Sequence, residues 1–228
     1  MASQVVELLR SAQLEVPREV IAGTLSAAHR LRLWMDRGAA LLILLAAGPF
    51  MLLCAWLIRR DGGPATFDHY RVGTGGRLFR CRKFRTMRLG AEAALSEILA
   101  RDPVLRAEWE THHKLADDPR VTPLGKWLRR SSLDELPQLL NVLHGEMALV
   151  GPRPITLEEL RRYGAARWHY LSVPPGMTGL WQVSGRNRTG YERRVELDKL
   201  YVTTRSAWLD CKILAKTVLV VLTREGAC

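Results

Sequence analysis

Two adjacent carboxylates, Asp134 and Glu135, are the residues of this 228-residue chain best suited to chemistry. Because proline is tolerated only in the first turn of a helix, Pro137 predicts a helix that begins near Asp134. A carboxylate placed there could attack a phosphoryl group or help to hold a divalent cation. The spacing Ser132-x-x-Glu135 also matches a capping box, in which both side chains only satisfy the helix N-terminus. On spacing alone, both interpretations stay open.

Arginines surround this pair in the sequence and favour phosphate chemistry. Arg129 and Arg130 precede it, and Arg153 follows in the sequence GPRP. A proline on each side of Arg153 restricts the loop, which reduces the entropy lost when the guanidinium binds an anion. Carboxylates would repel a nucleic acid, but they suit phosphoryl transfer, where a divalent cation and arginines neutralise the phosphate oxygens.

The overall composition indicates a phosphate-rich partner. The chain has 34 basic and 23 acidic residues, a net charge of +11, and most of the basic residues are arginine. Arginine binds phosphate with two parallel hydrogen bonds, so nucleic acid, an anionic membrane surface and phosphorylated substrates all fit. A GC-rich coding sequence would also favour arginine. The four cysteines form no CxxC pair, which fits neither a zinc site nor a disulfide framework.

Residues 38–58 form a run of 21 residues without a charged side chain. At about 1.5 Å per residue, a helix of this length just covers a hydrocarbon core of ~30 Å. Gly48-Pro49 stands at the midpoint, where proline bends a helix. Arginines flank the run on both sides, whereas a spanning helix has an asymmetric distribution of basic residues. We therefore expect a re-entrant helix with both ends on the cytoplasmic face; a simple span and a buried core helix are the alternatives.

The rest of the chain divides into an N-terminal extension and one larger domain. Residues 1–37 contain helical stretches and a basic end suited to lipid headgroups. Residues 59–90 hold nine basic and two acidic residues, glycine-rich turns and a short strand, RLFRCRKF. We expect helices over 91–114 with a break at Asp102-Pro103, and near 136–144, 156–163 and 191–203. The predicted fold is α/β but mostly helical, with units 1–37, 38–58 and 59–228.

Four blocks resemble the bacterial sugar transferases, the monotopic polyprenyl-phosphate hexose-1-phosphate transferases. They are KFRTM (83–87), DPRVTPLGKWLRRSSLDELPQLLNVLHGEMALVGPRP (118–154), PGMTGLWQVSGRN (175–187) and YERRVELDKLYV (191–202). Within that family the chain resembles the short form, similar to the galactosyl- or glucosyl-phosphate transferases that begin exopolysaccharide synthesis in rhizobia. Phe67-Asp68-His69-Tyr70 departs from the Phe-Arg-Gln-Glu type of segment common in the wider family.

The resemblance implies a fold and a location. It implies a re-entrant membrane helix broken at Gly48-Pro49 and a compact catalytic domain, over 59–228, that rests on the membrane with interfacial helices. The domain would lie on the cytoplasmic face of the bacterial inner membrane.

The resemblance also implies a reaction and residues for it. Asp134 would attack the β-phosphate of a UDP-sugar, release UMP and carry the sugar phosphate until polyprenyl phosphate accepts it. Glu135, together with Asp134, would hold Mg²⁺, and Arg153 would hold a phosphate. Lys83 and Arg129 fall on basic positions of the family that face phosphates, with surface or structural pairing as the alternative.

Further expectations concern Asp198 and the partners. Asp198 falls on an acidic position of the family near the site, where a structural ion pair is the alternative. The implied partners are a UDP-hexose, with glucose or galactose favoured, undecaprenyl phosphate and membrane lipid. Nucleic acid is not expected, and a homodimer is compatible with the resemblance.

Two other classes of protein fit parts of the sequence. A membrane-anchored basic protein could bind nucleic acid or lipid through residues 59–90 without catalysis, and an adaptor with a single span could bind other assembly proteins. In the first case Asp134 and Glu135 would be helix caps, and replacing them with Asn and Gln would cost little beyond stability.

Overall fold

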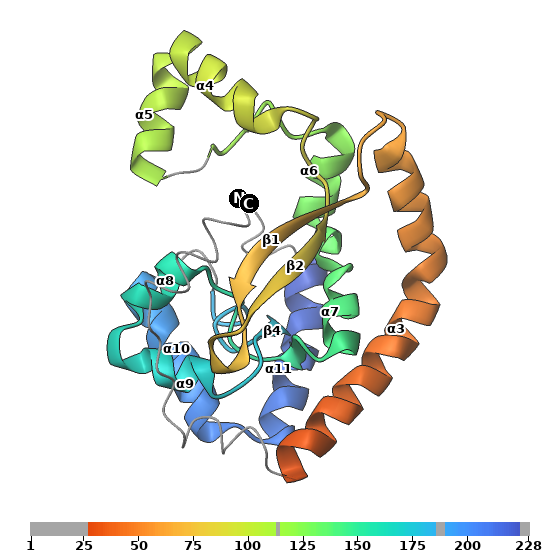
Figure 1. Ribbon diagram of the computed structural model, residues 1–228, viewed down its shortest axis with the longest axis vertical. Helices are drawn as coiled ribbons and strands as arrows, with labels where there is room; N and C mark the ends of the chain where they lie inside the picture. The colour runs from red at the N-terminus through yellow and green to blue at the C-terminus, as the bar shows by residue number, and fades with distance from the viewer. Residues whose placement is uncertain (1–26, 113–114, 186–189, 224–228) are drawn as a thin grey trace.

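The computed structural model describes residues 27–112, 115–185 and 190–223 (Figure 1). Residues 1–26 of the expected N-terminal extension lie outside these ranges. The described chain begins with helix α3, Ala27–Arg59, which runs along one side of the molecule and changes direction along its length (Figure 1). It is mostly helical beyond that, with two small sheets, so the expectation of a mostly helical α/β fold is met in its coarse form.

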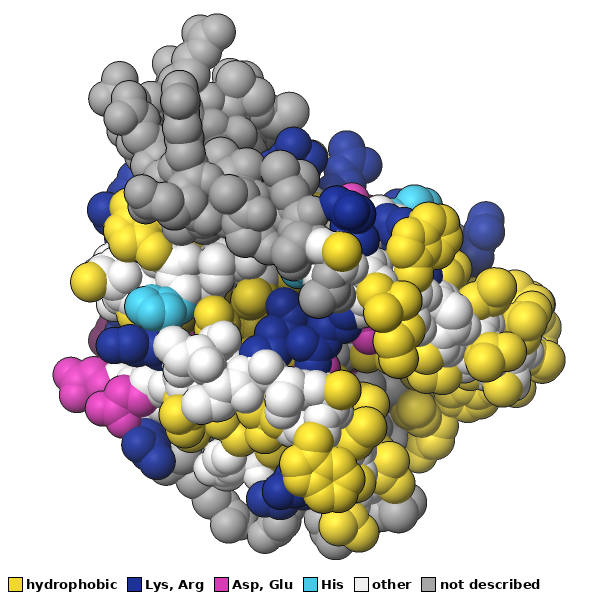
Figure 2. All heavy atoms as spheres, turned by 90° about the horizontal axis from the view of Figure 1, so that it is seen from below, with side chains coloured by type: hydrophobic (Ala, Val, Ile, Leu, Met, Phe, Trp, Pro, Cys, Tyr) yellow, Lys and Arg dark blue, Asp and Glu magenta, His cyan; other side chains and the backbone are white. Residues whose placement is uncertain are grey.

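Helix α3 keeps most of its apolar surface outside the protein core. In the described part of the chain, His29–Arg59 is a segment long and apolar enough to cross a membrane, with a mean hydropathy of 2.5 over its most apolar window. Only 11% of that window is buried, which contradicts the alternative of a buried core helix. Seen from below, hydrophobic side chains crowd the side on which α3 lies (Figure 2).

The chain remains helical through Gly48-Pro49. The expectation that the helix is interrupted at these two residues is therefore wrong. Proline removes one backbone donor but leaves the helix on either side intact, and the axis turns without an extended segment. Whether the helix enters and leaves by the same face of a membrane stays a prediction. Its inner face packs through Ala40 against α7 and through Cys54 and Ile58 against Phe84.

A β-hairpin follows α3. Strands β1, Thr66–Val72, and β2, Leu78–Phe84, pair antiparallel around the short 3₁₀ turn η1, Thr74–Gly76. The expected strand RLFRCRKF is thus confirmed to within one residue. Tyr70 and Arg80 pair on one face of the hairpin, and the alternate residues, His69 and Cys81, pair on the other.

One buried asparagine joins the hairpin to helix α7, Gln138–His144. Asn141 is fully buried, and its side-chain amide donates to the carbonyl of Arg80 at 2.7 Å and accepts from the backbone N–H of Arg82 at 3.1 Å. The side chain therefore acts as a short strand against the outer edge of β2. Since buried polar groups must be hydrogen-bonded, this contact holds β2 and α7 in one relative position.

Helices α4, Ala91–Arg101, and α5, Pro103–His112, extend away from the body of the molecule (Figure 1). The expected break at Asp102-Pro103 is confirmed, because the Asp102 carboxylate accepts from the backbone N–H groups of Val104 and Leu105. The chain then returns through helix α6, Pro123–Arg130, to a second 3₁₀ turn, η2, Leu133–Glu135, which comes before α7. The helix expected near 136–144 is therefore shorter at its start.

Strand β3, Ala148–Val150, pairs in parallel with β4, Gly176–Thr178, at the centre of the domain. Gly151 and Gly176 approach so closely that a Cβ on either would overlap the other's backbone. Thr178 joins this pair to the last helix, since its hydroxyl lies 2.7 Å from that of Thr217.

The remaining elements pack against the hairpin, against β3 and β4, or against one another. They are α8, Leu157–Arg162; η3, Gly164–Ala166; α9, Arg167–Leu171; α10, Tyr191–Thr204; and α11, Ala207–Thr223. The expected helices near 156–163 and 191–203 are confirmed. A capping box forms at the start of α8, where Thr156 and Glu159 exchange side-chain and backbone hydrogen bonds.

Candidate active site

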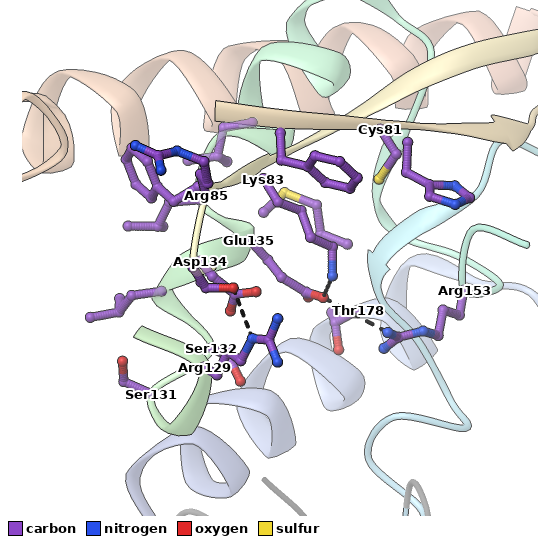
Figure 3. A pocket seen from close by; sticks show the side chains of 18 of the residues that line it. Cys81, Lys83, Arg85, Arg129, Ser131, Ser132, Asp134, Glu135, Arg153 and Thr178 are labelled. Carbon is purple, nitrogen blue, oxygen red and sulfur yellow. Dashed lines mark hydrogen bonds and ion pairs between the residues drawn. The ribbon is translucent and has the colours of Figure 1, made fainter. Parts of the chain in front are cut away.

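A cavity of 910 Å³ opens between the hairpin, the turn η2 and helix α11. Lys83, Arg129, Asp134, Glu135 and Arg153, which are far apart in the sequence, all line it (Figure 3). Asp198 does not line the cavity. Five of the six residues singled out from the sequence therefore meet in one place.

The two carboxylates sit on the turn η2 rather than in a capped helix. Ser132, just before it, has a φ of 56° and makes no side-chain capping hydrogen bond. The capping-box interpretation of Ser132 and Glu135 is therefore wrong. A positive φ is unusual for a residue other than glycine and marks a backbone held in place by its surroundings. Here it turns the chain so that both carboxylates face the cavity (Figure 3).

Glu135 lies between two cations from different parts of the fold. The Lys83 ammonium, on β2, donates to Glu135 Oε1 at 2.5 Å. The Arg153 guanidinium approaches the same oxygen from a different direction, at 3.9 Å (Figure 3). All three side chains are partly exposed, so the cations remain open to a second anion.

Asp134 is the more shielded of the two carboxylates. Burial raises its pKa, while Lys83 acts in the opposite direction; Glu135 adds to the rise, and Arg129 opposes it. Arg129 belongs to α6, and its Nε donates a hydrogen bond of 2.9 Å to the Thr86 hydroxyl, which orients the guanidinium. This contact depends on Gly125, because a Cβ there would collide with the Thr86 backbone.

Arg153 extends from a tightly packed loop after β3. The close approach of Gly151 to Gly176 fixes where this loop leaves the sheet. The guanidinium of Arg153 then lies 5.7 Å from the centre of the Trp181 ring, and Arg194 lies 4.7 Å from the same ring. Such cation–π contacts position both guanidinium groups without using their hydrogen-bond donors.

Asp198 belongs to a buried network behind Trp181. Only 2% of it is exposed, and its carboxylate accepts a hydrogen bond of 2.8 Å from the Tyr163 hydroxyl. Burial raises its pKa to about 6, against the opposing effects of Tyr163, Arg194 and Arg153. Asp198 therefore does not face the cavity, and its hydrogen bond comes from the Tyr163 hydroxyl rather than from the ion pair considered as the alternative. Its electrostatic effect on Arg153 is indirect.

Strand β1 contributes a wall of the cavity that the sequence analysis did not single out as a site. Phe67, His69 and Arg71 line it together with Cys81 and Lys83. The signal was available, because residues at alternate positions of a hairpin share a face. Using it required knowing the register, in which Phe67 faces Lys83 and His69 faces Cys81.

The acidic residues of the cavity could supply part of a magnesium site. Among the described residues, no cluster of three or more histidine, cysteine or acidic side chains could enclose a metal ion. Two carboxylates on one turn are nevertheless a suitable donor set, because Mg²⁺ is often held by one or two carboxylates and by the phosphates of a substrate. Since Glu135 already binds Lys83, a metal ion would have to share it.

The chain is similar to known proteins over most of its length. The sequence profile of the family described as bacterial sugar transferase matches residues 27–224. An undecaprenyl-phosphate galactose phosphotransferase of Salmonella typhimurium is 52% identical over 192 residues, which are 84% of this chain and 40% of that protein. A UDP-galactose-lipid carrier transferase of Erwinia amylovora is 50% identical over 192 residues, 84% of this chain and 40% of that protein.

Exopolysaccharide production protein ExoY of Sinorhizobium fredii, a shorter relative, is 46% identical over 189 residues, 82% of this chain and 84% of that protein. The chain thus spans about two fifths of the first two relatives and most of the third.

Proposed function

Because this chain belongs to the bacterial sugar transferase family, we propose that it is a phosphoglycosyl transferase that moves a hexose-1-phosphate from a UDP-hexose to undecaprenyl phosphate. UMP would be released, and the product would be the first membrane-bound intermediate of an exopolysaccharide. Two similar proteins carry galactose in their names, which supports galactose as the hexose. Glucose is the second hexose to test. The observation that carries the proposal is the convergence of Lys83 and Arg153 on Glu135, beside Asp134, in one cavity.

In the first step, a carboxylate oxygen of Asp134 attacks the β-phosphorus of the donor. A bond forms between that oxygen and phosphorus, and the bond from phosphorus to the oxygen bridging the two phosphates breaks. The electron pair leaves with UMP, and Asp134 carries the hexose phosphate as an acyl phosphate. Lys83, Arg129 and Arg153 neutralise the charge that develops on the phosphate oxygens.

In the second step, a phosphate oxygen of undecaprenyl phosphate attacks the same phosphorus. The bond to Asp134 breaks, which frees the carboxylate and yields the diphosphate-linked sugar. Two steps at one carboxylate suit this site, since Asp134 is shielded and flanked by cations while its surroundings open into a cavity.

The proposed cofactor is Mg²⁺, held by Asp134 and Glu135 together with the donor's phosphates. When bound, it would neutralise phosphate charge and strengthen the electrophilic character of the β-phosphorus. Lys83 keeps Glu135 oriented toward the cavity in the arrangement described above.

The proposed location is the cytoplasmic face of the bacterial inner membrane, with α3 as a re-entrant helix and α11 at the interface. In support, α3 and α11 both expose large apolar side chains, among them Leu42 and Leu52 on α3 and Val218 and Leu219 on α11. Arg30 and Arg60, both exposed, flank the apolar part of α3. Replaced by cysteine one at a time, in a background in which Cys211 and Cys228 are changed to serine, both should react with an impermeant label from the cytoplasmic side only.

The reaction is tested by measuring which nucleotide is released. Detergent-purified protein is given Mg²⁺, undecaprenyl phosphate and, in turn, UDP-galactose, UDP-glucose and their N-acetylated analogues. We expect UMP from one donor, only when lipid phosphate is present at turnover, and covalent label on the protein from a donor labelled at its β-phosphate. Asp134→Asn should abolish both signals. Asp117→Asn, a change at an exposed carboxylate that pairs with Lys126, should leave both intact.

Other outcomes would overturn the proposal. Release of UDP would make the protein an ordinary glycosyltransferase, and UMP release without labelled protein would rule out the covalent step. No nucleotide from any donor, with the protein shown to be folded, would favour a membrane-anchored binding or adaptor protein.

A further inference from the structure

The wall of the cavity formed by β1 carries polar and aromatic groups that the proposed mechanism leaves without a role. Phe67 and His69 stand at alternate positions of the strand, with ring centres 6.4 Å apart, and both face the cavity. Both residues are exposed rather than packed in the core. Aromatic groups that open into a polar cavity are candidates for ligand contact.

The hydrogen bonding of His69 determines what its ring can offer. Nδ1 lies 3.0 Å from the backbone carbonyl of Tyr70. A carbonyl oxygen only accepts, so Nδ1 carries the proton and donates it. In the neutral ring, Nε2 is then a bare acceptor. Partial burial, followed by the charge of Arg71, lowers the pKa of His69 and favours this neutral form.

A bare acceptor selects among the chemical groups of the substrates. Phosphate oxygens are acceptors themselves and are served by Lys83, Arg129 and Arg153 on the other walls. A polyprenyl chain has no polar hydrogen to donate. The groups of the donor that complement Nε2 are the hydroxyl groups of the hexose and the ribose and the N3–H of uracil. The flat face of Phe67 complements the apolar face of a sugar ring.

The hairpin register indicates which part of the donor lies there. Phe67 is directly across from Lys83, whose ammonium binds Glu135. The row of β1 side chains therefore lies one strand spacing, about 5 Å, from the row that carries Lys83, which the proposed mechanism places beside the reacting phosphate. Figure 3 shows Lys83 and Cys81 along this face of β2. The hexose is joined to the attacked phosphorus through a single oxygen, whereas a second phosphate separates the uridine from it.

We propose that Nε2 of His69 accepts a hydrogen bond from a hydroxyl group of the donor's hexose and that Phe67 packs against the same ring. Strand β1 is then the element that discriminates between hexoses. This inference rests on the proposed function and names a selectivity determinant within it. Tyr70 and Arg80, on the opposite face of the hairpin, take no part.

The test compares donors that lack single hydroxyl groups. The wild-type protein, His69→Phe and His69→Gln are assayed for UMP release with UDP-galactose, UDP-glucose and their 2-, 3-, 4- and 6-deoxy analogues. We expect one deoxy analogue to lower the wild-type kcat/KM about tenfold, because it leaves Nε2 unpaired, and to lower that of His69→Phe less than about twofold. His69→Gln keeps an acceptor oxygen and should retain part of the discrimination.

A second histidine provides a matched control. His144 is exposed at the end of α7, its Nδ1 lies 2.6 Å from the Leu140 carbonyl, and it does not line the cavity. His144→Phe should therefore keep the wild-type ranking of donors. The ratio between donors does not depend on how much of each variant is folded, so partial misfolding cannot imitate the effect. Inhibition by UMP should stay within about twofold of wild type in every variant.

Three outcomes would overturn the inference. Equal deoxy penalties in wild type and His69→Phe would remove His69 from hexose recognition. Weaker inhibition by UMP in His69→Phe, with unchanged hexose ranking, would assign the ring to the nucleoside. A wild-type protein that releases no UMP from any donor would overturn the proposed function and this inference with it, whereas the first two results arise in an active enzyme.

Discussion

Asp134 and Asp198 are two shielded carboxyl groups in different surroundings. Burial raises the pKa of both, and cationic side chains oppose that rise in both cases. Asp134 opens into a cavity of 910 Å³, whereas Asp198 is 2% exposed and bonded to Tyr163. A raised pKa is therefore a poor sign of chemistry by itself. Access to a space that can hold a substrate separates the two groups.

The largest effect should come from removing each carboxylate in turn. Asp134→Asn should lower kcat/KM for UMP release by about 10³-fold or more, because the proposed nucleophile is lost. Asp198→Asn should cost less than about tenfold, because Asn still accepts from Tyr163 and only the field at Arg153 changes. Steady-state kinetics on both variants, with thermal unfolding as the control for folding, check this. Comparable losses in the two variants would break the comparison.

The second largest effect on activity should come from Lys83, which acts on Asp134 and not on Asp198. Lys83→Met should lower kcat/KM by about 10²-fold, because a cation facing the phosphate is lost. Lys83 also holds the pKa of Asp134 down, so its removal should raise that pKa further. Since the carboxylate form is the nucleophile, the acid-side loss of activity should begin at a higher pH.

A pH–activity profile of Lys83→Met measures both effects. Lys126→Met is the matched control, because Lys126 pairs with Asp117 on the surface. An unshifted acid limb in Lys83→Met would show that Lys83 does not act on the nucleophile.

The third prediction concerns how Asp198 makes the free energy of unfolding depend on pH. Its pKa is raised from 3.8 to about 6 in the folded protein, so folding favours the protonated form. This group therefore lowers the free energy of unfolding as the pH rises through that interval, and the full loss is present above it. Asp198→Asn should remove the loss and be more stable than wild type by about 3 kcal/mol at neutral pH.

Thermal unfolding of wild type and Asp198→Asn across this range checks the sign. The difference should shrink to zero below about pH 3, where the wild-type carboxyl is protonated in both the folded and the unfolded state. A variant less stable than wild type at neutral pH would mean that the ionised Asp198 is held favourably by Arg194 and Arg153.

The smallest effect concerns backbone strain, which accompanies Asp134 and not Asp198. Ser132 has a φ of 56°, which glycine adopts without cost. Ser132→Gly should therefore be stabilised by about 0.5 kcal/mol and keep its activity, and Ser132→Val should be destabilised by about 1–2 kcal/mol. Unfolding midpoints of the two variants measure this. Equal stability of Ser132→Val and wild type would show that the turn relaxes.

Local features were the ones that the sequence predicted well. The strand around Cys81, the break at Asp102-Pro103 and the apolar helix all follow from short-range patterns of proline, charge and apolar residues. Lys83 was connected with Glu135 only through the family resemblance, because no local pattern connects residues that far apart. Arg153 was also indicated by its proline-flanked loop, which follows the carboxylate pair in the sequence.

The errors have physical causes of the same kind. Ser132 and Glu135 match a capping box in the sequence. In the structure, Lys83 from β2 binds the Glu135 carboxylate, and Ser132 adopts the left-handed backbone conformation, so no capping hydrogen bond forms. The wall formed by His69 and Phe67 depends on strand register, which the pairing partner determines. Asp198 shares the buried face of α10 with Leu197 and Tyr201, yet the sequence does not show what that face packs against.

The contact that Asn141 makes with β2 affects how the donor preference of such an enzyme can change by substitution. Asn141 binds β2 only through the main-chain atoms of Arg80 and Arg82, and those atoms are the same whatever side chains stand there. Substitutions on β1, the strand on the other side of β2, thus leave this attachment to α7 in place. A strand anchored in this way lets donor preference change by point mutation while the catalytic turn stays in place, which makes β1 the natural place to begin engineering a new sugar preference.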